Sequence, residues 1–203
     1  IVSERRKNTT FKAVAGQTLI RIPFHIKKEE TELTRTFPKR PFVPSDERAR
    51  AQRCEEILTI QAMGLKKRLA HTNSRTAVVG ISGGLDSTLA LLVTAKAFDM
   101  LGRDKKDIIA VTMPCFGTTD RTYNNACEMT RKTGAALKEV PIADAVNIHF
   151  RDIGQDPENH DVTYENSQAR ERTQVLMDIA NRTGGMVIGT GDMSELALGW
   201  ATY

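Results

Sequence analysis

The chain has 203 residues, of which 40% are hydrophobic and 27% charged, a composition that fits a soluble globular protein of one or two domains. Lys and Arg number 29 against 25 Asp and Glu, but the basic excess is confined to residues 1–50, and the remainder is slightly acidic. No apolar run approaches the roughly 20 residues of a membrane span, and no signal peptide is visible. The sequence therefore argues against a membrane as partner. Without interleaved aromatic residues, the basic segment is also weak support for nucleic-acid binding.

The cysteines indicate a reducing environment. Cys54, Cys115 and Cys127 are odd in number and show no C-x-x-C spacing, so neither a disulfide framework nor a zinc site is expected. We therefore predict a cytoplasmic protein. Because the chain begins at Ile1 rather than at Met, we also expect it to be part of a longer protein.

Residues 1–44 do not have the pattern of a domain of their own. Apolar and polar residues alternate over 18–26, which predicts a strand, although Pro23 restricts it to the edge of a sheet. Residues 37–44 contain three prolines and predict an extended linker. We place a domain boundary after residue 44, so that the main domain covers residues 45–203.

Helices and strands alternate throughout the main domain. The expected helices cover 45–71, 88–101, 120–134, 143–153, 164–182 and 192–198, and the expected strands cover 76–81, 107–113, 136–142 and 185–190. This alternation predicts an α/β fold, a doubly wound parallel sheet with helices on both faces. Ligands should then bind at the carboxyl ends of the strands.

A glycine-rich loop, Ser82-Gly-Gly-Leu-Asp-Ser87, joins the first expected strand to the next helix. A strand, a tight glycine turn and a helix N-terminus form an anion site, because the first N–H groups of a helix lack partners and its dipole favours negative charge. The Walker pattern is absent, since no Lys follows Gly84. Asp86 would repel a bare phosphate, so we predict that it holds a divalent cation bridging to phosphates. The alternative is a purely structural corner.

Two polar residues follow the last expected strand. Glu195 lies about one turn into the next helix, so its carboxylate could share a Mg²⁺ ion with Asp86. It could equally be an exposed first-turn acid that the helix dipole favours. Thr190 could bind a phosphate or a ribose, or simply end the strand. Spacing alone leaves these alternatives open.

The front of the helix expected at 164–182 carries Asn166, Arg170 and Arg172. Cations near a helix N-terminus are slightly unfavourable in isolation, so the two arginines suggest an anionic partner. Asn166 and Arg170 are four residues apart and share a helix face. A solvated charged face is the alternative.

Three stretches, in this order, carry a family resemblance. They are Ser82–Ser87, Glu165-Asn-x-Gln-Ala-Arg170 and Gly189-Thr-Gly-Asp-x-Ser-Glu-Leu-Ala-Leu-Gly-Trp-x-Thr-Tyr203. Together they resemble glutamine-dependent NAD⁺ synthetase, a ligase of the ATP pyrophosphatase (PP-loop) superfamily, whose fold is adenine nucleotide alpha-hydrolase-like. Pro41-Phe-Val-Pro44 also resembles the segment that joins this family's nitrilase-like glutaminase domain to its synthetase domain. Residues 1–44 would be the glutaminase tail plus linker, and 45–203 a C-terminally incomplete synthetase domain.

The resemblance implies a role for individual residues. ATP would be bound by Gly80, Ser82, Gly83, Gly84, Asp86, Ser87 and Thr190, with Asp86 and Ser87 as the catalytic residues. Mg²⁺ would be held by Asp86 and Glu195. Deamido-NAD⁺ would be bound by Asn166, Arg170, Glu195, Trp200, Ala201, Thr202 and Tyr203.

The resemblance also implies a reaction and partners. ATP would adenylate the nicotinate carboxylate of deamido-NAD⁺, and ammonia supplied from glutamine would then displace AMP, giving NAD⁺, AMP and pyrophosphate. The family's core is a homodimer. Two other functions stay open at this point: another PP-loop ATP pyrophosphatase, of the tRNA-modifying or GMP synthetase type, and a nucleotide-binding fragment without catalytic activity.

Overall fold

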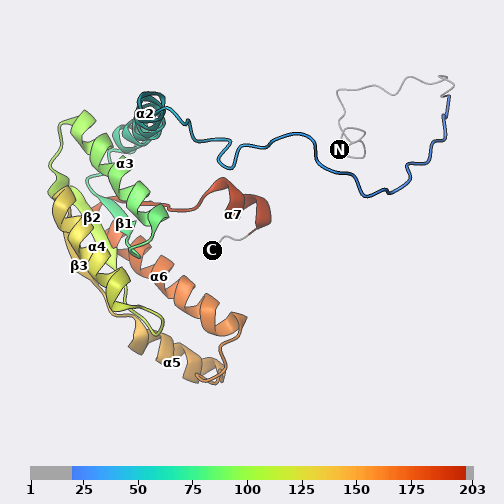
Figure 1. Cartoon of the computed structure of the whole chain (residues 1–203). Helices are drawn as coiled ribbons and strands as arrows, with labels where there is room; N and C mark the ends of the chain where they lie inside the picture. The colour runs from blue at the N-terminus through green and yellow to red at the C-terminus, as the bar shows by residue number, and fades with distance from the viewer. Residues whose placement is uncertain (1–19, 200–203) are drawn as a thin grey trace. The chain divides into compact units, whose positions relative to one another are not determined.

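The computed structural model describes residues 20–199 and divides the chain into two units, one ending at Phe42 and one beginning at Val43 (Figure 1). In the first unit, residues 20–42 form neither helix nor strand, and all of them are exposed. The strand expected at 18–26 is therefore wrong over 20–26, while residues 18 and 19 lie outside the described part. Residues 20–26 belong to no sheet among residues 20–199, and their alternating apolar side chains are exposed.

Within residues 43–199 the second unit contains a parallel sheet of four strands, in the order β3-β2-β1-β4. The strands are β1 (Ala77–Gly80), β2 (Ile108–Thr112), β3 (Ala136–Glu139) and β4 (Met186–Ile188). The register places Ala77 of β1 opposite Ile108 on one side and Met186 on the other. The expected strands are confirmed, although three are shorter at both ends and β3 begins at Ala136 as expected but already ends at Glu139.

The helices and a short 3₁₀ segment alternate with these strands. They are α2 (Glu47–His71), α3 (Leu85–Leu101), η1 (Lys105–Asp107), α4 (Asp120–Thr133), α5 (Ala143–Ile153), α6 (Val162–Thr183) and α7 (Met193–Leu198). The first helix was expected to begin at residue 45, but α2 begins at Glu47 and its cap is Asp46, whose carboxylate accepts a hydrogen bond from the Ala49 N–H at 2.7 Å. A carboxylate is at least as good a cap as a hydroxyl and adds a favourable charge to the helix dipole. None of the helices in residues 20–199 has the length and apolarity that crossing a membrane would require.

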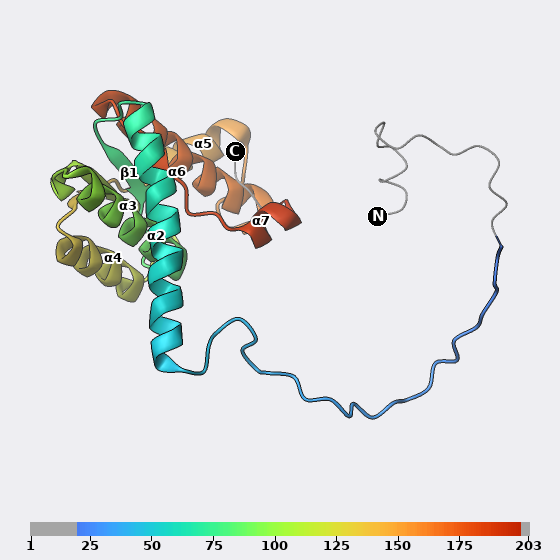
Figure 2. The same ribbon diagram turned by 90° about the horizontal axis from the view of Figure 1, so that it is seen from above.

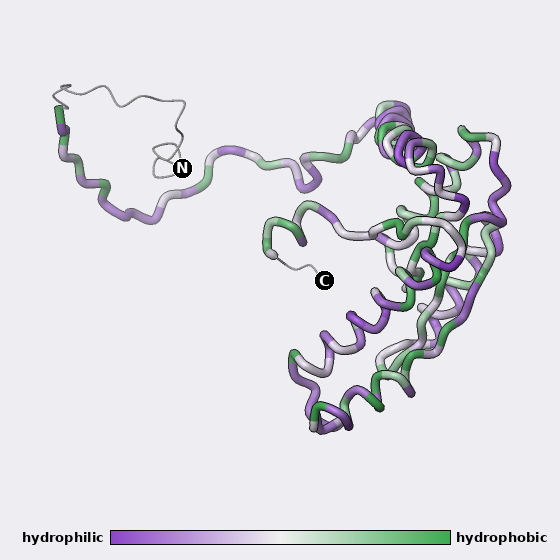
Figure 3. Tube along the Cα trace, turned by 180° about the vertical axis from the view of Figure 1, so that it is seen from behind, coloured by the Kyte–Doolittle hydropathy of each residue, from purple (hydrophilic) through white to green (hydrophobic). Residues whose placement is uncertain are grey.

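Helices cover both faces of the sheet, as the sequence predicts. Figure 2 shows α3 and α4 on one side of β1 and α5 and α6 on the other. Ala62 and Leu69 of α2 pack in the same core layer as α3. Ala77 and Val79 point into the first layer with Leu91 and Phe98 of α3, whereas Val78 points into the second layer. Because side chains alternate between the faces of a strand, β1 is apolar throughout and buried on both sides. The helices, in contrast, are banded apolar and polar along their length (Figure 3).

The order of the strands creates a reversal point beside β1. The chain runs from β1 through α3 to β2 and through α4 to β3, and it then returns through α5 and α6 to β4 on the other side of β1. In doubly wound sheets the crevice at such a reversal, outside the carboxyl ends of the strands, is where ligands bind. The glycine-rich loop leaves β1 at this point.

Candidate functional site

The loop after β1 passes directly into the first turn of α3. Gly84 is the N-cap, so α3 begins at Leu85 rather than at the expected Thr88, and Asp86 and Ser87 lie within the helix. An extended glycine can serve as N-cap without a side-chain hydrogen bond. The first N–H groups of α3 therefore face the space beyond β1 and remain available to an anion.

Hydroxyl groups hold this loop in shape. The Ser87 side chain is buried, and its Oγ accepts a hydrogen bond from the Ser82 N–H at 3.3 Å and donates one to the Gly84 carbonyl at 3.2 Å. The Ser82 Oγ lies 3.1 Å from the Ser87 Oγ and accepts the Gly84 N–H at 3.2 Å. Ser87 is thus an organiser of the loop backbone, whereas Ser82 is exposed to the space in front of it.

Gly83 faces away from that space and towards α4. Its φ of +81° is in the left-handed region, and a Cβ added to it would lie 2.1 Å from the carbonyl oxygen of Thr122 in the first turn of α4. No side chain larger than hydrogen fits such an approach of two backbones. Gly83 therefore shapes the loop by letting it lie against α4.

A cavity of about 630 Å³ opens in front of the loop. Of the residues predicted to bind ATP, those that line it are Gly80, Ser82, Gly84, Asp86, Ser87 and Thr190, and Glu195 lines it as well. Gly83 does not. Ile81, directly after β1, also lines it. The remaining lining residues come from the end of β2, the segment after it, α4 and α6: Thr112, Met113, Gly117, Thr118, Thr122, Tyr123, Gln168, Arg172 and Leu176.

The two carboxylates of the predicted metal site share this cavity. Asp86 is exposed in the first turn of α3. Glu195 forms a capping box at the start of α7: its Oε2 accepts the Asp192 N–H at 3.0 Å, and the Asp192 carboxylate accepts the Glu195 N–H at 2.8 Å. Both interpretations of Glu195 that the sequence left open are therefore compatible. It caps α7 through Oε2 and is at the same time one of the residues that line the cavity.

The donor set fits Mg²⁺ bound together with a nucleotide. Within residues 20–199 no group of three or more His, Cys, Asp or Glu side chains is placed to hold a metal ion. Mg²⁺ in nucleotide sites commonly takes only one or two carboxylates and completes its shell with phosphate oxygens and water. Asp86 and Glu195, from the segments after two neighbouring strands, match that requirement.

The predicted dinucleotide-binding residues lie apart from this cavity. Asn166 is half-buried and Arg170 exposed on α6, and neither lines it. The face of α6 that does so carries Gln168, Arg172 and Leu176, which are spaced four residues apart. Trp200, Ala201, Thr202 and Tyr203 lie outside the described residues, so their roles stay predictions.

Tyr123 lines the cavity and was not singled out in the sequence. Its hydroxyl donates a hydrogen bond to the Glu139 carboxylate at the end of β3, at 2.5 Å. This bond, with a smaller contribution from Cys127, raises the pKa of Tyr123 from 10.0 to about 12. The only signal in the sequence was its position in the first turn of a helix after a strand. The phenol thus stays protonated at neutral pH and fixes the wall of the cavity to β3.

The raised pKa of Tyr123 predicts a specific loss of stability in alkali. A pKa raised on folding contributes stability that is complete below the unfolded value near pH 10 and is lost as the pH rises towards 12. The urea midpoint of the wild type should therefore fall more steeply between these pH values than that of Tyr123→Phe. Equal slopes in the two proteins would show that the hydrogen bond to Glu139 does not form in solution.

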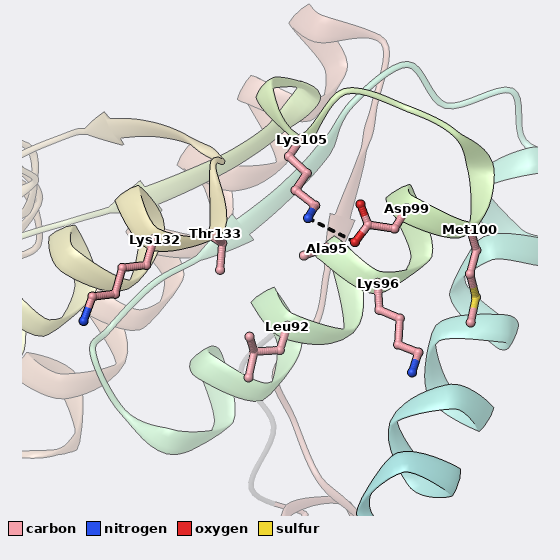
Figure 4. A pocket seen from close by; sticks show the side chains of 8 residues that line it. All are labelled: Leu92, Ala95, Lys96, Asp99, Met100, Lys105, Lys132 and Thr133. Atoms are coloured by element: carbon pink, nitrogen blue, oxygen red, sulfur yellow. Dashed lines mark ion pairs between the residues drawn. The ribbon is translucent and has the colours of Figure 1, made fainter.

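A second hollow, of about 670 Å³, is a poorer anion site although lysines surround it. It lies among α3, η1 and α4 and is lined by Leu92, Ala95, Lys96, Asp99, Met100, Lys105, Lys132 and Thr133 (Figure 4). Lys105 pairs with Asp99 at 3.0 Å, Lys132 with Glu128 at 2.8 Å, and Lys96 with Glu55. Each ammonium group already has its own carboxylate, so this hollow offers no unbalanced positive charge.

The fold and the site define a class of protein. A doubly wound parallel sheet, with a glycine-rich anion loop and an acidic residue at its reversal point, is a nucleotide-binding domain of the adenine nucleotide alpha-hydrolase-like fold. The family model described as NAD synthase matches residues 57–203. The chain belongs to this family, and the resemblance stated from the three motifs is confirmed.

Individual relatives agree with this assignment. The glutamine-dependent NAD(+) synthetase of Mycobacterium leprae is 46% identical over 175 residues, which cover 84% of this chain and 26% of the relative. The solved glutamine-dependent NAD⁺ synthetase of Acinetobacter baumannii, in complex with ADP, is 29% identical with a TM-score of 0.67 and covers 73% of this chain and 28% of that one. An NH3-dependent NAD synthetase from Campylobacter jejuni, at 23% identity and a TM-score of 0.62 over 73% of this chain and 61% of that one, shares the fold. The chain spans about a quarter of the length of the curated relatives.

Proposed function

We propose that this chain is the ATP-binding part of a glutamine-dependent NAD⁺ synthetase, a ligase that converts deamido-NAD⁺ into NAD⁺. The observation that carries the proposal is the cavity at the reversal point of the sheet, where the loop after β1, Asp86, Thr190 and Glu195 converge. Family membership and the ADP bound by the Acinetobacter baumannii relative support a nucleotide in this cavity. A tRNA-modifying or GMP synthetase-type activity has no comparable support.

The proposed chemistry suits these residues. An oxygen of the nicotinate carboxylate attacks the α-phosphorus of ATP, the bond from that phosphorus to the β-phosphate oxygen breaks, and pyrophosphate leaves with the electron pair. Ammonia then attacks the acyl carbon, AMP leaves, and the nitrogen loses a proton. Neither step needs a nucleophilic side chain, because positioning and charge neutralisation lower both barriers.

The protein's own groups would do this positioning. The unpaired N–H groups at the start of α3 and the exposed hydroxyl of Ser82 would bind phosphate oxygens, and Thr190, from the segment after the neighbouring strand β4, would contribute a further hydroxyl. Ser87 would act through the loop that it organises. A Mg²⁺ ion held by Asp86 and Glu195 would neutralise phosphate charge.

The acceptor and the assembly are further parts of the proposal. Asn166, Arg170, Glu195 and residues 200–203 would bind deamido-NAD⁺, and the full-length enzyme would have a homodimeric core in the cytoplasm and draw ammonia from glutamine. The family motifs quoted from the sequence support this. Since Asn166 and Arg170 lie on a different face of α6 from Arg172, the dinucleotide would approach that helix from outside the ATP cavity.

A product assay tests the proposed function. The full-length protein, supplied with ATP, Mg²⁺, glutamine and deamido-NAD⁺, should form NAD⁺, AMP and pyrophosphate in equal amounts, and omission of deamido-NAD⁺ should abolish AMP formation. Pyrophosphate release that depends on tRNA instead would identify the PP-loop alternative. ATP binding without any AMP formation under these conditions would identify a module that binds nucleotide but is catalytically silent.

Glu195→Gln separates the two roles of Glu195. A glutamine at this position can still accept the Asp192 N–H and keep the capping box, but it cannot neutralise a metal ion. We expect unchanged thermal stability and activity lower by about 10- to 100-fold, as for loss of a metal-site contact. Asp192→Ala removes the cap but keeps the Glu195 carboxylate, so it should cost about 1 kcal/mol of local helix stability. Full activity in Glu195→Gln would show that Glu195 caps α7 but does not bind a metal ion.

A further inference from the structure

Arg172 is the one cationic side chain among the described residues that line the ATP cavity. The same lining contains the carboxylates of Asp86 and Glu195, so the cavity has an excess of one negative charge. A triphosphate adds several more negative charges. Even with a divalent metal on the two carboxylates, such a ligand calls for a positive protein group at close range.

The guanidinium of Arg172 has no partner of its own among the described residues. Over residues 20–199 the side chain makes no hydrogen bond, ion pair or ring contact, although it is half-buried. Arg170 is different, since it is exposed and has an interaction elsewhere. A partly buried cation without a counter-charge is unfavourable for the protein alone, and becomes favourable when an anion occupies the space in front of it.

The packing of α6 places Arg172 at the cavity. Four residues before it, the buried Gln168 donates its side-chain N–H to the Tyr164 carbonyl at 3.1 Å. Four residues after it, Leu176 packs against the core and lies so close to the end of β1 that a Cβ on Gly80 would be 3.0 Å from its Cδ1. Gly80 therefore lets α6 approach β1, and this approach places the Gln168, Arg172 and Leu176 face at the cavity.

We propose that Arg172 binds the β- and γ-phosphates of ATP and stabilises pyrophosphate as it leaves. This inference rests on the proposed function. When the bond between the α-phosphorus and the β-phosphate oxygen breaks, the electron pair stays on pyrophosphate, whose negative charge increases. The planar guanidinium offers several N–H donors to phosphate oxygens and transfers no proton. Asp86 and Glu195 would hold the metal, and the N–H groups at the start of α3 would bind further phosphate oxygens.

Binding of ATP, AMP and inorganic pyrophosphate to the full-length protein with Mg²⁺, measured by calorimetry, tests this inference. We expect Arg172→Gln to weaken the binding of ATP and of pyrophosphate by about 10- to 100-fold, the scale of one charge-assisted contact. The binding of AMP should weaken by less than about 3-fold. Arg172→Lys should recover part of the loss, because it keeps the charge without the planar fork. Arg182→Gln, in the exposed last turn of the same helix, should bind all three ligands as the wild type does.

The outcomes separate this inference from the proposed function. Equal binding of pyrophosphate by the wild type and Arg172→Gln would overturn the role of Arg172, even if the enzyme makes NAD⁺. If Arg172→Gln weakens the binding of AMP and of ATP equally, the inference is also overturned, because that result indicates a structural role that does not depend on the β- and γ-phosphates. Phosphate-selective weakening in a protein that forms no NAD⁺ would support Arg172 and overturn the proposed activity.

Discussion

Gly83→Ala is expected to destabilise the second unit by about 3 kcal/mol, from roughly 1–2 kcal/mol for an L-residue with a left-handed backbone and a similar amount for overpacking. The φ of Gly83 is +81°, and the added Cβ would lie 2.1 Å from the Thr122 carbonyl oxygen, far inside contact distance. The obstacle is backbone, so no side-chain rotation can relieve it. Either the loop or the start of α4 must move. Urea unfolding of the 203-residue chain measures the loss as a lower midpoint at an unchanged slope.

Two other glycines provide matched controls for Gly83→Ala. Gly102 has a φ of +65° but no atom within 4 Å of an added Cβ, so Gly102→Ala should cost only the roughly 1–2 kcal/mol of backbone strain. Gly84 has a φ of −87°, and a Cβ there would meet only the Ser82 hydroxyl, at 3.3 Å, so Gly84→Ala should cost only about 0.5–1 kcal/mol, because alanine is a poorer N-cap than glycine. If Gly83→Ala lowers the free energy of unfolding no more than Gly102→Ala does, the loop does not approach α4 closely in solution.

The order and type of the elements in residues 45–199 could be predicted because each has a strong local signal. Three of the strands, β1, β2 and β4, are short and apolar and contain β-branched residues, whereas β3 has two apolar residues followed by two charged ones; the helices have apolar residues at 3.6-residue spacing. Their ends depend on hydrogen bonds that the pattern does not contain. Thr88 was the expected start of α3, but Gly84 caps that helix, so Asp86 and Ser87 belong to its first turn. The sequence pattern thus placed Asp86 and Ser87 in a loop, whereas the structure places both in the first turn of a helix.

The sequence could not predict which face of α6 lines the cavity. Arg170 and Arg172 are two residues apart, so they point to different sides of the helix, and composition does not tell which side meets the cavity. The answer depends on how α6 is rotated against β1, which Leu176 and the missing side chain of Gly80 decide. Such a contact joins residues far apart in the sequence. Local pattern therefore predicts that α6 supplies a cation, and only packing identifies Arg172.

Asp86→Ala is expected to lower kcat/KM for NAD⁺ synthesis by the full-length protein by about 100-fold or more, the scale of removing one group that stabilises transition-state charge. The physical reason is its position in the first turn of α3, in a cavity that also contains Glu195. A carboxylate there repels phosphate unless a cation lies between them. The variant should accordingly need much more Mg²⁺ for half-maximal activity.

The same repulsion gives Asp86→Ala a signature that misfolding cannot imitate. Without Mg²⁺ the variant should bind ATP as tightly as the wild type or more tightly, because one negative charge is gone, whereas with Mg²⁺ it should bind more weakly. Asp144→Ala is the matched control, since Asp144 is also an exposed first-turn acid, of α5, and does not line the cavity. Both substitutions remove a similar favourable interaction with a helix dipole, about 0.3–1 kcal/mol, so stability alone should not distinguish them. Wild-type Mg²⁺ dependence in Asp86→Ala would remove Asp86 from the metal site and leave it as a helix-terminal acid only.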